Sequence, residues 1–177
     1  MDNDASSDAH GALIEPNTLK FQRVLPGPIG HVWAYLVQSD LRRQWLAAGD
    51  MELKVGSPVE FVWRNDELNS PPGNRPAGFP EEQRLQGQVS VLEVLRKLSI
   101  AWTGFGEVSY ALEARGDKVL LTMIQRGLPN RDVVVMFAAG SHVHLDILAA
   151  ILEGNSLPLF WDAWSKLQKD YDLRIAR

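Results

Sequence analysis

Apolar and polar residues alternate along the segment from Thr18 to Leu25, which predicts a strand with four residues on one face: Leu19, Phe21, Arg23 and Leu25. Pro26 and Pro28 end this strand. Pro28 suits the first turn of a helix, because its missing N–H would be unpaired there. Apolar spacings of three and four residues then predict a helix to Val37 and a second short helix from Ser39 to Trp45.

The middle of the chain has the two-residue period of β-strands. Its apolar residues fall on shared faces in four successive sets: Val59, Phe61 and Trp63; Leu85, Val89 and Val91; Leu98, Ile100 and Trp102; Val108, Tyr110 and Leu112. A further strand is predicted from Lys118 to Gln125. Connectors such as Arg96-Lys97 are far too short for parallel crossovers, so we expect an antiparallel sheet.

One connection is unusually long. The segment 64–83 contains four prolines and two glycines. Loops of this length in compact domains are usually either functional lids or disordered inserts. The sequence leaves both interpretations open.

A long helix is predicted from Arg131 to Gly154, roughly 35 Å long at about 1.5 Å per residue. At about 100° per residue, one broad arc of this helix is apolar and includes these positions: Val134, Phe137, Ser141, His144, Leu145, Leu148, Ile151 and Leu152. His142, Asp146 and Glu153 fall on the opposite arc.

A second C-terminal helix is predicted to begin near Pro158. It carries an aromatic stripe of Phe160, Trp161, Trp164 and Tyr171, together with Leu167. Aromatic side chains bury about 150 to 250 Å² each, so this stripe needs a cover. We predict that these four aromatic residues form a surface for a protein partner; docking on the chain's own domain and homodimer formation are the alternatives.

Length and composition set the domain organisation. With 177 residues, of which 45% are hydrophobic and 23% charged, the chain suits one domain with a real core. Residues 1–16 are small, polar and unpatterned, which predicts a disordered tail. We therefore expect a single domain over residues 17–177, with 157–177 as an added helix.

Charge and residue usage exclude several function classes. The formal net charge of −4 argues against a nucleic-acid partner, which would need clustered Lys and Arg. The absence of Cys excludes disulfides, thiolate nucleophiles and Cys-ligated zinc. We found no uninterrupted apolar run long enough to span a membrane and no basic N-terminal signal, so we expect a cytoplasmic protein.

Four segments carry a resemblance to a known family. The segment Phe21–Trp45, the closing strand Val119–Arg126, the turn Gly127-Leu128-Pro129 and the run Gly140–Leu152 with Glu153-Gly154 after it resemble bacterial SRPBCC-superfamily proteins, the START and pollen-allergen-like group. The nearest subgroup is similar to the C-terminal domain of the activator of the heat-shock protein 90 ATPase. The resemblance covers about Leu19 to Gly154.

The resemblance implies an α+β helix-grip fold: a strand, two short helices, a curved antiparallel sheet and a long helix that closes an internal cavity. Members of the wider superfamily bind lipids, hormones or polyketides, and some cyclise polyketides, so the fold does not select a function. The family often has a Gly-Trp pair where this chain has Gly140-Ser141. The missing indole should either enlarge the cavity or be replaced by a neighbouring Trp, and Gly140 should allow the helix to approach the sheet closely.

We predict that the chain binds a small, largely apolar ligand in this cavity without a cofactor. The predicted lining is Trp45, Phe61, Trp63, Trp102, Phe105, Met123, Phe137, Ser141, His144, Leu145 and Leu148. One alternative is a protein-interaction module resembling the ATPase activator. Another is a cyclase-like enzyme, in which His144 or an inward Arg126 would act on a bound carbonyl compound.

No catalytic or metal constellation is predicted. His142 and His144 differ by about 200° around the helix axis, so they cannot ligate one ion, and His142 with Asp146 supplies too few ligands. We expect His142 and Asp146 to form a solvated surface pair. His144 is expected to be a core histidine satisfied by hydrogen bonding, with ligand orientation or acid–base chemistry as the alternative. The sequence does not fix the facing of Arg23 and Arg126. A rim or outer-face position is favoured, and an inward one would need a carboxylate partner or an anionic ligand, since a buried unpaired charge is costly.

Overall fold

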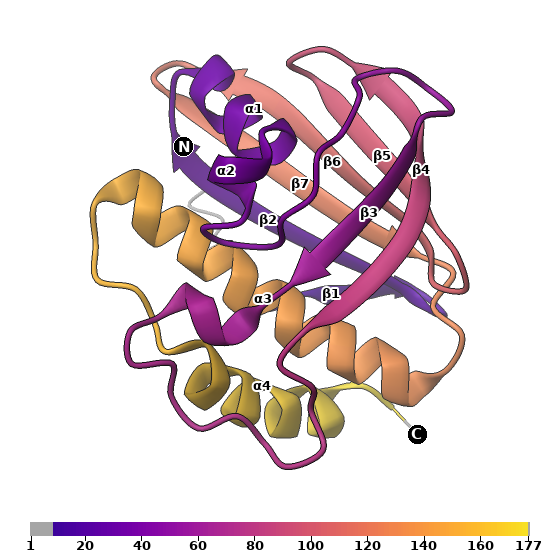
Figure 1. Cartoon of the computed structure of the whole chain (residues 1–177), viewed down its shortest axis with the longest axis vertical. Coiled ribbons are helices and arrows are strands. Elements are labelled where there is room, and N and C mark those ends of the chain that lie inside the picture. Colours follow the sequence, from indigo (N-terminus) through magenta and orange to yellow (C-terminus); the bar gives the residue numbers. More distant parts are fainter. Residues whose placement is uncertain (1–8, 177) are drawn as a thin grey trace, which may run out of the picture.

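Seven strands form one curved antiparallel sheet in the order β1-β2-β7-β6-β5-β4-β3 in this computed structural model, which describes residues 9–176 (Figure 1). The strands are β1 (Ala12–Glu15), β2 (Thr18–Pro26), β3 (Pro58–Trp63), β4 (Gln83–Glu93), β5 (Lys97–Trp102), β6 (Gly106–Arg115) and β7 (Lys118–Arg126). Every neighbouring pair is antiparallel, as the short connectors predicted.

The helices are α1 (Ile29–Val37), α2 (Ser39–Arg42), the 3₁₀ helix η1 (Asn65–Leu68), α3 (Arg131–Glu153) and α4 (Phe160–Arg174). Figure 1 shows α3 lying between the sheet and α4, with α1 and α2 near one end of the sheet. The order and packing confirm the α+β helix-grip fold. One hydrophobic cluster extends from Leu19 on β2 to Ile175 after α4.

The bounds of α3 follow from its caps. The side chain of Asn130 accepts a hydrogen bond from the backbone N–H of Val133, and Gly154 ends the helix in the left-handed conformation at φ 73°. By length and composition alone this 23-residue helix could cross a membrane, although polar residues such as His142 and Asp146 interrupt its apolar stretch. Of the most apolar 18-residue stretch of α3, 67% is buried inside the domain, as expected for a core helix.

The N-terminal prediction was wrong in its described part. Residues 12–15 form strand β1 instead of a disordered tail, and β1 pairs with β2. The sequence of β1, Ala-Leu-Ile-Glu, does not alternate between apolar and polar residues, and all four residues are exposed. No pattern in the sequence therefore indicated this strand. The backbone N–H of Gly11 donates to the Tyr171 hydroxyl at 2.6 Å. Residues 1–8 of the predicted tail lie outside the described residues.

The apolar faces of β3, β5 and β6 are confirmed by burial, whereas β4 differs in one detail. Its register with β5 shifts between Val89 and Val91. A bulge of this kind adds one residue and changes the face of every residue after it. Leu92 therefore packs against the core in place of Val91.

The long connection between β3 and β4 is docked on α4. Trp161 Nε1 donates to Asp66 Oδ1 at 2.7 Å, and the N–H of Phe160 donates to Asn69 Oδ1 at 2.8 Å. The Phe79 ring lies 4.9 Å from that of Trp164 between centroids. These contacts rule out the disordered-insert interpretation for this segment.

The predicted partner surface on α4 must be corrected. Phe160, Trp161, Trp164 and Tyr171 are only 1%, 4%, 8% and 1% exposed, because α4 packs on α3 and η1. Arg131 reinforces this docking by donating to the Asp172 carboxylate at 2.7 Å. The stripe therefore docks on its own domain, which was one of the stated alternatives.

Candidate functional site

A cavity of about 400 Å³ lies between the sheet, α3 and α4. Strands β3 to β7 form one wall, and the part of α3 from Met136 to His144 forms the opposite wall. The N-terminal half of α4 closes the side. Exposed Gln83 and Arg84 at the start of β4 mark where the cavity reaches the surface. Ligand pockets usually have volumes of about 300 to 1,000 Å³, so the size suits a small organic molecule.

Eight of the eleven predicted lining residues border this cavity: Phe61, Trp63, Trp102, Phe105, Met123, Phe137, Ser141 and His144. Trp45, Leu145 and Leu148 do not, and all three are core residues exposed by 1% or less. The Trp45 indole instead donates to the carbonyl of Tyr35 at 2.9 Å. The apolar arc of α3 extends beyond the cavity, and past His144 it faces solid packing.

The α4 side wall was missed as part of the site. Phe160, Trp161 and Trp164 border the cavity, although their spacing had suggested a partner surface. A Cβ added to Gly140 would have Trp164 Nε1 as its nearest neighbour at 3.9 Å. Gly140 therefore faces an indole from α4, where close approach to the sheet had been expected. This indole beside Gly140-Ser141 fits the prediction that a neighbouring Trp replaces the missing one.

His144 combines a fixed orientation with burial. Its Nδ1 lies 2.7 Å from the backbone carbonyl of Trp45, and a carbonyl can only accept, so Nδ1 carries the proton. Burial lowers the pKa of His144 to about 4, although the bond to Trp45 raises it. The ring is therefore neutral near pH 7. His144 is therefore a core histidine held by one hydrogen bond through Nδ1, and Nε2 is left as a hydrogen-bond acceptor.

A buried arginine near the cavity was not anticipated. Arg42 is 1% exposed, and its guanidinium donates to the carbonyls of Leu36, Val37, Ala47 and Gly49. Its Cζ lies 4.1 Å from the centre of the Phe61 ring. Burial lowers the pKa of Arg42 to about 10, so it stays charged near pH 7. No sequence feature distinguished it from the neighbouring exposed Arg43.

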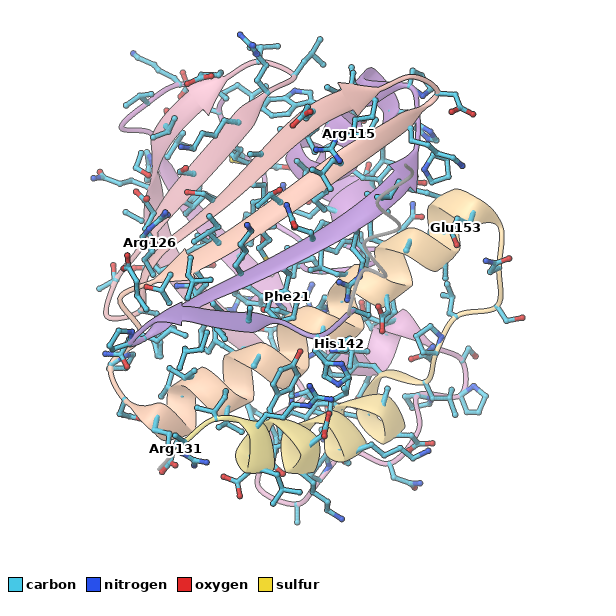
Figure 2. All side chains as sticks on the ribbon, turned by 180° about the vertical axis from the view of Figure 1, so that it is seen from behind. Phe21, Arg115, Arg126, Arg131, His142 and Glu153 are labelled. Carbon is cyan, nitrogen blue, oxygen red and sulfur yellow. The ribbon has the colours of Figure 1, made fainter. Side chains whose placement is uncertain are left out.

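Another polar cluster lies on a different face of α3, between β2 and α4. His142 Nε2 is 3.3 Å from Asp146 Oδ2, and His142 Nδ1 bonds the Tyr171 hydroxyl at 2.9 Å. Arg23 donates to Asp146 Oδ1 at 3.0 Å. Figure 2 shows His142 beside α4, and the Phe21 ring on β2 is 6.3 Å away.

This cluster corrects one prediction and decides one question that the sequence left open. His142 is 5% exposed, so it does not form a solvated surface pair, because α4 covers the arc that the helical wheel assigned to solvent. Arg23 is 9% exposed and points inward to a carboxylate, whereas Arg126 is exposed as expected. Among residues 9–176, no three His, Asp or Glu side chains form a group that could hold a metal ion.

Residues 26–153 match the family model for "Activator of Hsp90 ATPase homolog 1-like protein". The chain belongs to this family. The match covers most of the chain and agrees with the SRPBCC-type fold described above. No functionally curated protein matches this member of the Hsp90 ATPase activator homolog 1-like family.

Solved structures place this family member among similar folds. A Bordetella parapertussis protein encoded by gene BPP1335 is 31% identical, with a TM-score of 0.79 over 97% of this chain and 93% of that one. CalU16 from Micromonospora echinospora is 19% identical, with a TM-score of 0.64 over 88% and 86%. DynU16, a protein in the dynemicin biosynthetic locus, is 18% identical, with a TM-score of 0.61 over 78% of this chain and 48% of DynU16. The last two likenesses show the fold alone.

Proposed function

We propose that this protein binds a small, largely apolar molecule in the cavity between the sheet, α3 and α4. The observation that carries the proposal is the cavity itself, about 400 Å³ with aromatic side chains on all three walls. Folded proteins normally contain few voids larger than one water molecule. A space of this size with aromatic walls and an opening beside Gln83 is therefore best explained by an occupant.

The walls indicate the character of that occupant. Phe61 and Trp102 on the sheet and Phe137 on α3 line the cavity, and Trp161 and Trp164 close the side. Aromatic walls favour flat, apolar ligands, because stacked and edge-to-face ring contacts add to the gain from apolar burial. We infer a ligand that contains at least one aromatic ring.

A cyclase-like or hydrolytic enzyme is less well supported. His144 is the general-base candidate in the cavity, and its pKa of about 4 makes it a weak base near neutral pH. General-base catalysis is most efficient when the pKa of the base is near the working pH. Arg126, the other candidate, is exposed and does not line the cavity. We therefore favour binding over proton abstraction.

A protein-interaction role is also less well supported. The four aromatic residues that suggested it are buried within the chain. We keep the cytoplasmic location as part of the proposal.

The proposal can be tested with the neutral dye N-phenyl-1-naphthylamine, which fluoresces strongly in apolar surroundings. We expect saturable binding to the wild type. Gly140→Leu should weaken it at least about tenfold, because the added side chain enters the cavity and removes apolar contact area. Gly30→Leu is the matched control: Gly30 is also helical, is exposed, and has no atom near its Cβ position.

Native mass spectrometry of the purified protein provides a second measurement, since a tightly bound ligand adds mass. Absence of both dye binding and added mass would refute the proposal. Equal dye binding by wild type and Gly140→Leu would show that the dye occupies another site, and would also count against it.

A further inference from the structure

Asn65 Oδ1 at the cavity is buried without a protein hydrogen-bond partner. Three further polar atoms that line the α3 and sheet walls make no hydrogen bond to another residue among 9–176. They are His144 Nε2 and Ser141 Oγ on α3, and the Tyr110 hydroxyl on β6. All three residues are less than 10% exposed. Buried polar atoms are normally paired, because an unpaired one costs about 1 to 3 kcal/mol. His144 Nε2, Ser141 Oγ and the Tyr110 hydroxyl are not among the fully buried unpaired atoms, so they are open to the cavity, where water or a ligand can supply their hydrogen bonds.

The three residues line the same cavity. Ser141 and His144 are three residues apart on α3, so they are neighbours on the same face of the helix. Tyr110 lies on the sheet wall, with its ring 6.4 Å from that of Trp45. The Trp45 carbonyl in turn holds His144. Trp45 thus contacts one polar residue on each wall, Tyr110 through its ring and His144 through its carbonyl.

Of the three, His144 has the most restricted chemistry. Its Nδ1 proton is committed to the Trp45 carbonyl, so Nε2 can only accept. The low pKa of the ring, about 4, keeps Nε2 unprotonated near pH 7. A hydroxyl can either donate or accept, but this nitrogen requires an O–H or N–H from the ligand.

The cations near the cavity do not favour an ionised ligand. All Arg42 hydrogen bonds go to backbone carbonyls, and its guanidinium stacks on the Phe61 ring. Arg84 at the mouth is exposed and already paired with Glu60 and Glu82. A carboxylate beside His144 would lose its hydration without gaining a cationic partner, which is costly.

We propose that the cavity selects neutral aromatic molecules that carry a hydroxyl group, and that this hydroxyl donates a hydrogen bond to Nε2 of His144. The inference rests on the proposed function and names its ligand class. The aromatic ring packs against the aromatic side chains that line the cavity, Trp102 and Phe137 among them. Ser141 and Tyr110 are placed to accept from or donate to the same oxygen or a second polar group.

Calorimetry at pH 7 with three naphthalene probes tests this selection. The probes are 2-naphthol, which is a neutral donor, 2-methoxynaphthalene, which has the oxygen without the donor, and 2-naphthoate, which is an anion. We expect 2-naphthol to bind about tenfold more tightly than 2-methoxynaphthalene, because the ether leaves Nε2 unpaired. We expect 2-naphthoate to bind most weakly.

The His144→Phe variant should bind 2-naphthol and 2-methoxynaphthalene with nearly equal affinity. His31→Phe is the control, because His31 is exposed on α1, and it should retain the tenfold preference. Loss of the bond to Trp45 could unfold His144→Phe, so ¹⁵N NMR of the wild type provides an independent measurement. The Nε2 resonance of His144 should shift on addition of 2-naphthol and stay nearly fixed with 2-methoxynaphthalene.

The outcomes distinguish the two proposals. Equal wild-type affinity for 2-naphthol and 2-methoxynaphthalene would overturn the hydroxyl selection and leave the proposed function standing. Tightest binding of 2-naphthoate, or an unchanged Nε2 resonance with bound 2-naphthol, would also overturn it. Failure of all three probes to bind would overturn the hydroxyl selection, and failure of N-phenyl-1-naphthylamine to bind as well would count against the proposed function.

Discussion

Nδ1 of His144 lies 2.7 Å from the carbonyl oxygen of Trp45, and this hydrogen bond joins the middle of α3 to the turn after α2. The bond holds a neutral imidazole at the cavity wall and satisfies a buried backbone group. Phe160 covers the ring, with the two centroids 4.8 Å apart. The same residue therefore contributes both to the stability of the fold and to the proposed site.

Burial of His144 should make stability depend on pH. Its pKa falls from 6.5 to about 4 on folding, so the unfolded chain binds this proton more tightly. The stabilising contribution is complete above pH 6.5 and is lost as the pH falls toward 4. In that window His144 should lower the free energy of unfolding by up to about 1.4 kcal/mol per pH unit. Urea denaturation between pH 4 and pH 8 measures this slope.

The slope can be assigned by substitution. His144→Phe should lose this part of the pH dependence, whereas His31→Gln on the exposed face of α1 should keep it. If His144→Phe unfolded with the same pH dependence as the wild type, the buried neutral imidazole would not be its source.

Tyr171 should be important for the attachment of α4. Its hydroxyl accepts from Gly11 N–H at 2.6 Å and bonds His142 at 2.9 Å. Tyr171→Phe leaves those groups without this partner, so it should cost about 1 to 3 kcal/mol and speed hydrogen exchange at Gly11. In Tyr35→Phe, the lost hydroxyl has no hydrogen bond within residues 9–176, and the cost should be below about 0.5 kcal/mol. Equal costs in urea denaturation would contradict this role.

Asp146 should stabilise the fold as a partner for a buried cation. Burial alone would raise the pKa of Asp146, but the hydrogen bond from His142 and the electrostatic interactions with His142 and Arg23 lower it overall. Its contribution is therefore present above about pH 4 and is lost as the pH falls through its lowered pKa.

Asp146→Asn removes the carboxylate that pairs with the buried Arg23, and solvent reaches 39% of the Asp146 side chain. An intermediate cost of about 1 to 3 kcal/mol is expected at pH 7. Glu113→Gln, in an exposed pair with Arg115, should cost less than about 0.5 kcal/mol. If urea denaturation gave the Asp146 variant no larger a cost than the Glu113 variant, the ion pair with Arg23 would be of little importance.

Gly140→Ala should stabilise the protein by about 1 kcal/mol, because alanine is the better helix former. The new methyl group would meet only Trp164 Nε1, at 3.9 Å. Gly154→Ala should have the opposite effect, since Gly154 has φ 73° and alanine is strained there. Thermal denaturation measures both shifts. A lower melting temperature for Gly140→Ala would show that the helix wall does not tolerate a side chain.

The sequence predicted much of the fold because alternation and helical periodicity are strong along most of the chain. It could not reveal β1, whose residues are exposed and pair only along one edge of the sheet. It also placed His142 in solvent, because a helical wheel identifies an apolar arc but not which other face a later helix will cover.

The cavity was predicted through its aromatic strand faces and through the apolar arc of α3. Its limits could not be predicted, since they depend on where side chains leave space. Leu145 lies on the same arc as Phe137 yet is packed in the core, and Trp161 entered the wall only because α4 folds back. Arg42 is buried by tertiary contacts with backbone carbonyls, which no local pattern encodes.

The most direct test of the central claim is NMR of ¹³C-methyl methionine during titration with N-phenyl-1-naphthylamine. Met123 and Met136 line the cavity, whereas Met51 packs against the core elsewhere. We predict saturable shifts of the Met123 and Met136 methyl resonances, with that of Met51 unchanged. If dye binding moved neither cavity methionine, or moved all three equally, the cavity would not be the ligand site.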